Sequence, residues 1–293
     1  MNKSVFISFL LVLVSFVWAG SFIVVKSMTD GNMDPVSLGF LRFLVATPLM
    51  ILVVILRKKP LVLPLKEFPW LLVLGLSGVT FLYVFQFVGI QYTTASTSAV
   101  LINTNVIFIA ILSVLLLHER LTRKRSLGII LSFVGVLLVM LSQLSPEDFT
   151  LTNTFVLGCL FILLSAMCWA VYSLVGKRLL KVYDEWVITM YAFILGTLCF
   201  LPFVFSDLPS MVFQTSVSGW LAVLYLAVAC SLFGYLGWYY ALKHIDASQA
   251  AVFLNFIPLF TIIMSFVLGE RITWFFLLGA IFIIYGVYLA QRS

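Results

Sequence analysis

The sequence predicts an all-α integral membrane protein with ten transmembrane helices in two inverted five-helix repeats. Three observations support this fold class: the composition, the spacing of the apolar runs and an internal duplication. Of the 293 residues, 63% are hydrophobic and only 10% are charged, and the mean hydropathy is +1.19. A soluble domain has about 45–50% apolar and about 25% charged residues. The composition therefore excludes most classes of soluble enzyme.

Ten apolar runs follow one another along the chain, and each is long enough to cross a hydrocarbon layer of about 30 Å. Turn-forming or charged residues separate the runs, as at Asp30-Gly31-Asn32. The first run continues beyond Ala19-Gly20-Ser21, so we expect a retained helix and not a cleaved signal peptide. The runs lie at about residues 4–26, 35–56, 68–90, 95–117, 125–143, 154–176, 186–205, 217–242, 247–268 and 272–290.

The basic residues predict the orientation of these helices. If the N-terminus is cytoplasmic, the inner segments hold every Lys and Arg except Lys26 and Arg271 on the outer side and Arg42 within the second helix. This asymmetry follows the positive-inside rule. We therefore expect a multi-pass protein of the cell (inner) membrane with both termini in the cytoplasm. The net charge of +6 is then explained by the basic residues that orient the protein in the membrane, and no nucleic-acid partner is expected.

Motifs for catalysis, metal binding and cofactor binding are absent from the sequence. The four cysteines lie singly inside apolar runs and lack paired metal-ligand spacing. No phosphate-cradling glycine motif occurs, so ATP is not expected to drive the protein directly. The two histidines, His118 and His244, lie at helix ends, where we expect capping or snorkelling. The sequence thus predicts a protein that is not an enzyme and holds neither cofactor nor metal.

An internal repeat relates the two halves of the chain, with predicted boundaries at 1–145 and 154–293. Because five helices are an odd number, the two halves must have opposite orientations in the membrane, which is a known basis for alternating access. The alternative is a duplication without transport, as in a receptor or an assembly factor. An offset of 152 pairs Ala95-Ser96 with Ala247-Ser248 and Asn103 with Asn255, and an offset of 151 pairs Trp18 with Trp169, Glu119-Arg120-Leu121-Thr122 with Glu270-Arg271-Ile272-Thr273, Gly128 with Gly279 and Gly135 with Gly286.

Several local patterns accompany this duplication. The first helix holds a tryptophan, the second holds Leu41-Arg42-Phe43, and in both halves a helix opens Ala-Ser-x-x-Ala-Val-x-x-Asn and ends Glu-Arg-Leu/Ile-Thr. The chain resembles, over essentially its whole length, the EamA branch of the drug/metabolite transporter superfamily. The resemblance implies a ten-helix transporter of small metabolites, with a central cavity lined mainly by helices 1, 3, 4, 6, 8 and 9. It does not imply a particular metabolite.

Polar and aromatic side chains form stripes at helical spacing and are the candidate substrate-binding residues. Trp18 shares one face of helix 1 with Ser15 and Phe22, and Trp169 lies on the matching face of helix 6. An unpaired amide in hydrocarbon costs several kcal/mol, so asparagine and glutamine side chains should face protein or water. The alternative role is hydrogen bonding between helices. The candidates are Trp18, Arg42, Tyr83, Gln86, Asn103, Trp169, Tyr172, Tyr235, Trp238 and Asn255.

Charged residues near the membrane have both structural and functional interpretations. Arg42 lies about two turns into helix 2, where it would snorkel, pair with Asp30 or Asp34, or bind a substrate carboxylate. All 11 acidic residues fall at helix ends or in loops, and Glu119 and Glu270 are the deepest. We expect these two to form ion pairs or caps, with gating as the alternative. Without a carboxylate in the middle of the membrane, proton exchange of the small multidrug pump type is disfavoured.

These patterns predict a transporter with a neutral, aromatic-lined cavity at the midplane. We expect it to bind a small polar metabolite, such as an amino acid or a related zwitterion, between Trp18 and Trp169 within the lipid bilayer. Transport would proceed by rocking of the two halves, and the family resemblance favours export. Carriers of sugars, nucleosides or drugs are the alternatives within transport, and a non-transporting scaffold or sensor is the alternative outside it.

Overall fold

The computed structural model describes residues 3–59, 63–141, 153–205, 211–213, 215–267 and 274–291, and every regular element within them is a helix. Eight of the expected apolar runs form segments long and apolar enough to cross a membrane. The other two runs correspond to the helices Arg123–Leu141, which begins with three basic residues, and Trp274–Gln291, and neither is among these eight segments. The described residues therefore form a multi-pass membrane protein.

Several of the membrane-crossing segments consist of consecutive helical elements. The first half contains α1 (Lys3–Asp30), α2 (Pro35–Leu56), η1 (Leu65–Glu67), α3 (Phe68–Gly75), η2 (Leu76–Thr80), α4 (Phe81–Tyr92), α5 (Ala95–Ile102), α6 (Thr104–Leu117) and α7 (Arg123–Leu141). The second half contains α8 (Asn153–Leu179), α9 (Glu185–Phe200), η4 (Leu201–Phe203), α11 (Val217–Leu224), η5 (Tyr225–Phe233), α12 (Gly234–His244), α13 (Ala247–Ala251), η6 (Val252–Asn255), α14 (Phe256–Val267) and α15 (Trp274–Gln291).

The helices begin where the sequence supplies an N-cap. Asp34 precedes α2 and its carboxylate accepts a hydrogen bond from the Ser37 amide at 2.6 Å. Asp184 and Ser216 cap α9 and α11 in the same way. Such side chains accept from amides that have no partner within the helix, which stabilises the helix start. The apolar runs and their polar boundaries therefore define the elements.

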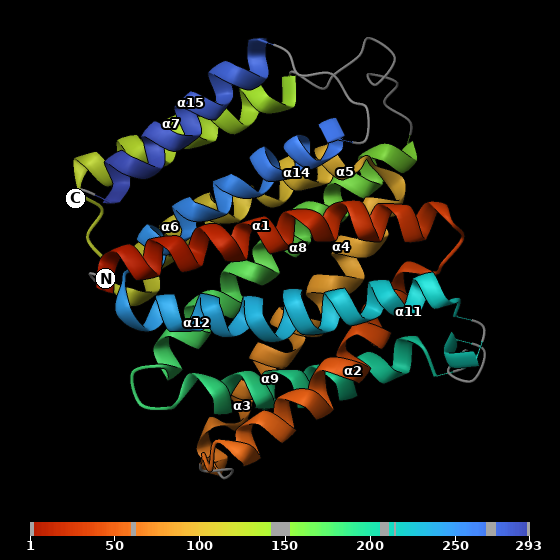
Figure 1. The fold of residues 1–293 in the computed structure, drawn as a ribbon. Helices are drawn as coiled ribbons and strands as arrows, with labels where there is room; N and C mark the ends of the chain where they lie inside the picture. The colour runs from red at the N-terminus through yellow and green to blue at the C-terminus, as the bar shows by residue number, and fades with distance from the viewer. Residues whose placement is uncertain are drawn as a thin grey trace.

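The helices lie in layers with α1 near the centre (Figure 1). The pair α7 and α15 forms one outer layer, and α5, α6 and α14 lie between this pair and α1. On the other side, α11 and α12 separate α1 from α2, α3 and α9. The first turn of α1 and the last turn of α15 lie at the same side of the molecule. Large apolar side chains such as Phe9, Leu115 and Ile281 are exposed on the outer faces, as expected where lipid surrounds the helices.

Glycines allow α7 and α15 to pack closely. A Cβ atom on Gly128 would lie 2.6 Å from the Gly286 carbonyl oxygen, and one on Gly135 would lie 2.7 Å from the Gly279 carbonyl oxygen. Only glycine permits this approach of two backbones. The order of the contacts makes the two helices antiparallel. By the repeat offset, Gly279 is the counterpart of Gly128 and Gly286 is the counterpart of Gly135. Gly128 therefore contacts the counterpart of Gly135, and Gly135 contacts the counterpart of Gly128, which is the pattern that a two-fold axis produces.

A π-helical segment interrupts the third membrane segment of each half. These segments are η2 in the first half and η5 in the second, and they flank the centre of the molecule. Wide turns of this kind leave backbone carbonyl groups available to other donors and occur frequently at functional sites. Their hydrogen-bond partners are aromatic side chains of the central region.

Candidate functional site

The centre of the molecule contains a cavity of about 50 Å³. This volume accommodates a few water molecules, whereas sites for small molecules usually measure about 300 Å³ or more, so a metabolite requires the cavity to widen. Residues from α1, α2, α4, α5, α6, α8, η6 and α14 line it: Trp18, Ser21, Phe22, Arg42, Leu82, Tyr83, Gln86, Ile102, Asn105, Trp169, Leu254 and Ile257.

Half of the predicted binding residues line this cavity. They are Trp18, Arg42, Tyr83, Gln86 and Trp169. The other five are fully buried outside its lining: Asn103, Tyr172, Tyr235, Trp238 and Asn255. The segment 217–244, expected to line the cavity, contributes no lining residue here, and α2 contributes Arg42 instead. In this structure the cavity is therefore lined by the first, second, third, fourth, sixth and ninth of the expected helices, with the second in place of the eighth.

The two repeat-related tryptophans contact one another directly. Their rings meet edge to face, with centroids 5.0 Å apart, so the two rings must separate before a solute can lie between them, and the bracketing of a solute stays a prediction. The Trp18 indole donates a hydrogen bond to the Cys230 carbonyl, within η5, at 2.9 Å. The Trp169 indole nitrogen is buried without a partner. The pair is therefore symmetric in position and asymmetric in hydrogen bonding.

A repeat-related pair of tyrosines lies beside the tryptophans. The hydroxyl oxygens of Tyr83 and Tyr235, which are 152 residues apart in sequence, are separated by 3.0 Å. The Tyr235 hydroxyl donates to the Gly78 carbonyl within η2. The π-helical segment of each half thus accepts a hydrogen bond from a central aromatic side chain of the other half. These bonds join the two halves at the inner wall of the cavity.

Arg42 reaches the cavity wall from α2 and is only 1% exposed. Its Nε donates to the Ser231 hydroxyl at 2.6 Å, and its guanidinium lies over the Tyr83 ring, 4.1 Å from the centroid. One terminal nitrogen, Nη2, is buried without a hydrogen-bond partner. The cavity therefore carries a positive charge, which corrects the expectation of a neutral site.

The two acids that were expected near Arg42 have other roles. Asp30 pairs with Lys26 at 3.0 Å, and Asp34 caps α2 through the Ser37 amide. Among the described residues, no ion pair includes Arg42. Its burial also contradicts snorkelling to the membrane surface. Pairing of Arg42 with Asp30 or Asp34 and its snorkelling to the surface are therefore wrong. Binding of a substrate carboxylate by Arg42 stays a prediction.

The buried amides divide into paired and unpaired groups. Asn255 is half paired: its Nδ2 donates to the Ser132 hydroxyl at 2.7 Å, between helices, while its Oδ1 is buried without a partner. Both polar atoms of the Asn103 amide are buried without partners. Sequence reasoning missed Asn105, which lines the cavity and whose Oδ1 has no partner. The available signal was an amide inside an apolar helix two residues beyond Asn103, which lies on a different helical face.

Glu119 joins three segments at the end of the molecule that also contains Lys177. Its carboxylate accepts from the Ala247 amide at 2.8 Å and from the Ser248 amide and hydroxyl, and it lies 3.3 Å from Lys177 Nζ. Burial opposes ionisation, but these hydrogen bonds and the ammonium outweigh it, so the pKa of Glu119 lies below its usual value. The predicted role as an ion pair and cap is confirmed for Glu119. Glu270 lies outside the described residues.

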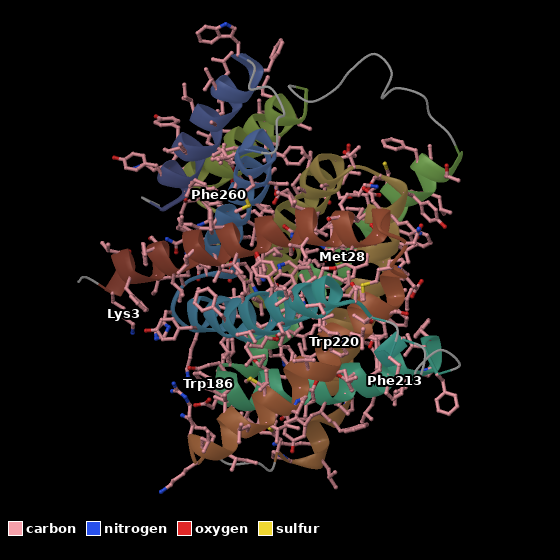
Figure 2. All side chains as sticks on the ribbon, turned by 45° about the vertical axis from the view of Figure 1, so that its right-hand side comes forward. Lys3, Met28, Trp186, Phe213, Trp220 and Phe260 are labelled. Atoms are coloured by element: carbon pink, nitrogen blue, oxygen red, sulfur yellow. The ribbon has the colours of Figure 1, made fainter. Side chains whose placement is uncertain are left out.

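Further ion pairs connect segments at this same end, which we call the basic end and define by residues 57–59, 63–67, 118–125, 177–186 and 243–248. Three ion pairs join different segments there: Lys59 with Asp184 at 2.7 Å, Arg125 with Asp246 at 2.7 Å and Lys243 with Glu185 at 2.5 Å. Figure 2 places Lys3 and Trp186 at this end and Phe213 at the opposite end. The opposite end has a surface depression of about 520 Å³ between residues 28–37 and 211–219.

A bundle of apolar helices long enough to cross a membrane, around a small cavity with a few polar groups, defines a multi-pass membrane protein. Residues 5–141 and 156–291 both match the EamA-like transporter family. The chain therefore belongs to the EamA-like transporter family. Membership implies a small-molecule substrate and a lipid environment.

Relatives with transporter names cover nearly the whole chain. An uncharacterized transporter of Archaeoglobus fulgidus is 39% identical over 97% of this chain and 96% of its own length. The uncharacterized transporter YyaM of Bacillus subtilis is 31% identical over 94% of this chain and 90% of its own length. A protein of Salmonella typhimurium named a probable amino-acid metabolite efflux pump is 26% identical over 96% of this chain and 93% of its own length.

A solved crystal structure has the same fold. It superposes with a TM-score of 0.79 and covers 100% of this chain and 97% of its own length, at 19% sequence identity. At this identity the likeness concerns the fold alone.

Proposed function

We propose that this protein exports small polar metabolites, such as amino acids, across the cell membrane by alternating access. The observation that carries the proposal is the central cavity, where repeat-related aromatic residues of both halves meet around Arg42, Gln86 and Asn105. Concave sites with a few polar groups among apolar walls are typical of small-molecule binding. The export direction and the amino-acid class rest on the family and on the name of the Salmonella relative.

The proposed architecture is ten membrane-crossing helices in two inverted repeats, residues 1–145 and 154–293. The antiparallel glycine contacts between α7 and α15 support this arrangement, because they pair each helix with its repeat counterpart. The Tyr83–Tyr235 contact supports it at the centre of the molecule. Inverted repeats allow each half to adopt the conformation of the other, which exposes the cavity to alternate sides.

We place the basic end in the cytoplasm, with both termini on that side. The four ion pairs that join different segments there support a conformation closed toward the cytoplasm. Transport then requires these contacts, including the one at Glu119, to break. A cysteine at Lys58 should be protected from an impermeant thiol reagent in intact cells, whereas one at Asn32 should react. The opposite labelling pattern would reverse the orientation.

Counterflow of radiolabelled solutes in proteoliposomes tests the proposed function. We expect at least one amino acid or related metabolite to exchange through the wild-type protein. Trp18→Ala and Trp169→Ala should each lower exchange about tenfold or more, because both remove cavity wall. Ile281→Ala is the matched control, since Ile281 is 63% exposed on the outer face of α15. Absence of exchange with every solute would instead indicate a scaffold or sensor.

A further inference from the structure

Arg42 is a buried cation whose counter-ion is missing from the described part of the chain. Five ion pairs occur among the described residues, and none of them includes Arg42. Its Nε donates to a neutral hydroxyl, that of Ser231, and its guanidinium lies over the rings of Tyr83 and Phe43, which carry no charge. Burying a charge is strongly unfavourable unless an opposite charge or a full set of hydrogen bonds compensates for it. An anion bound beside Arg42 would therefore compensate its buried positive charge.

The open donor of Arg42 belongs to a residue that lines the cavity. Nη2 is buried and has no partner, while Nε is already used by Ser231. A guanidinium presents its donors in a planar fork that matches a carboxylate, and Arg is the preferred partner for such groups in buried sites. The shape and the charge of the free donor both favour a carboxylate ligand.

The rest of the lining supplies neutral groups only. Gln86 and Asn105 contribute amides, and the Oδ1 of Asn105 has no partner. Phe22, Leu82 and Ile102 contribute an apolar wall. Within the lining no carboxylate is present that could balance a substrate ammonium group. A ligand with a single negative charge leaves the cavity neutral, whereas a zwitterion leaves it positive.

We propose that Arg42 binds the carboxylate of the transported solute, and that the cavity prefers organic acid anions with an apolar body over zwitterions of the same shape. This inference rests on the proposed function and specifies the substrate class of the same site. An amino acid is accepted through its carboxylate, and its ammonium group weakens binding. A solute without a carboxylate binds more weakly, because it leaves the positive charge of Arg42 uncompensated.

A matched set of three solutes tests this inference on the purified protein in lipid nanodiscs. The set is 4-methylpentanoate (an anion), leucine (the zwitterion of the same skeleton) and 4-methylpentanamide (neutral). Binding is followed by tryptophan fluorescence, because Trp18 and Trp169 line the cavity. We expect the anion to bind at least about tenfold more tightly than the amide, with leucine between them. Equal binding of acid and amide, or no binding of the acid, would overturn the inference.

Variants of Arg42 then assign the effect to one side chain. Arg42→Gln should abolish the difference between acid and amide, and Arg42→Lys should retain part of it, because the charge remains while the fork geometry is lost. The control is Lys26→Gln, which removes another cation of the first half that lies outside the cavity lining and pairs with Asp30. Should Arg42→Gln fail to fold, the wild-type comparison and Arg42→Lys still decide the question.

The counterflow experiment separates this inference from the proposed function. Exchange of amides or amines that persists in Arg42→Gln would overturn the carboxylate assignment and leave transport standing. Carboxylate binding that depends on Arg42, without exchange of any solute, would overturn transport and leave the binding assignment standing.

Discussion

The two halves of the molecule share a scaffold but contribute unequally to the cavity. The first half supplies most of the lining, including Arg42, Gln86 and Asn105, whereas the second supplies Trp169, Leu254 and Ile257. Positions equivalent by the repeat offsets carry Phe193, Trp238 and Ile257 in place of the three polar residues. The duplicated scaffold therefore kept its symmetry at the helix contacts and lost it where a solute would bind.

The largest expected effect concerns Trp238 and its counterpart Gln86. Trp238 is fully buried and donates to the Ser173 hydroxyl, so Trp238→Ala should lower the free energy of unfolding by about 3–5 kcal/mol. Gln86→Ala should lower it by about 1 kcal/mol or less, because Gln86 lies at the cavity edge. Unfolding of both variants in mixed micelles measures the difference.

Transport should show the opposite order for these two variants. We expect Gln86→Ala to weaken solute exchange while the protein remains folded, since it removes a polar group from the lining. Equal losses of stability in Trp238→Ala and Gln86→Ala would contradict the interpretation that Trp238 is a packing residue of the second half and that Gln86 is a cavity residue of the first half.

The symmetric part of the scaffold should respond symmetrically. Gly128→Ala and Gly286→Ala each place a Cβ atom 2.6 Å from the carbonyl oxygen of the other glycine. Overpacking of this kind costs about 2 kcal/mol, and we expect nearly the same loss from either variant. Ile130→Ala on the exposed face of α7 is the control and should change little. Unequal losses would show that the α7–α15 contact is not two-fold.

The tryptophan pair gives a smaller and asymmetric effect. Trp18→Phe leaves the Cys230 carbonyl without its donor, which should cost about 1–2 kcal/mol beyond the change in ring size. Trp169→Phe removes a buried N–H that has no partner, so its unfolding free energy should be higher than that of Trp18→Phe. The comparison cancels the common loss of ring area. Identical values for the two variants would contradict the assigned hydrogen bonding.

The sequence predicted the scaffold well because apolar length and turn chemistry act locally. The helix starts at Asp34 and Asp184 follow from their capping side chains, and the Glu119 contacts follow from its position at a helix end. The repeat offset of 151 also pairs Trp18 with Trp169, and the two rings are in contact in the structure. The resemblance to the EamA family is confirmed by the match over both halves.

The composition of the site could not be predicted in the same way, because it depends on the rotation of each helix about its axis. Asn103 and Asn105 are equally good candidates by residue type, yet only Asn105 lines the cavity. Arg42 lies close in sequence to Asp34, and although the local pattern assigns Asp34 to capping α2, nothing local shows that Arg42 instead contacts Ser231 and Tyr83 of other helices. The π-helical segments, which supply the carbonyls of Gly78 and Cys230, have no signature in the residue pattern.

The smallest expected effect is the response of the basic end to pH, and it contrasts Glu119 with the proton-carrying carboxylates of other transporters. Because the pKa of Glu119 is lowered on folding, its contribution to stability is present above the unfolded value and is lost as the pH falls through the folded value. The difference in unfolding free energy between the wild type and Glu119→Gln should therefore be constant from about pH 6 to 8. It should shrink only below about pH 4.5. Solute exchange at a fixed solute gradient should likewise be insensitive to an imposed pH gradient near neutrality. Glu119 is ionised there when Lys177 and the Ala247 amide hold it, and it stays ionised when these contacts break, because an ordinary carboxyl group is also ionised near neutrality. A steep dependence on the pH gradient that disappears in Glu119→Gln would contradict this, and would make Glu119 a proton-coupling site.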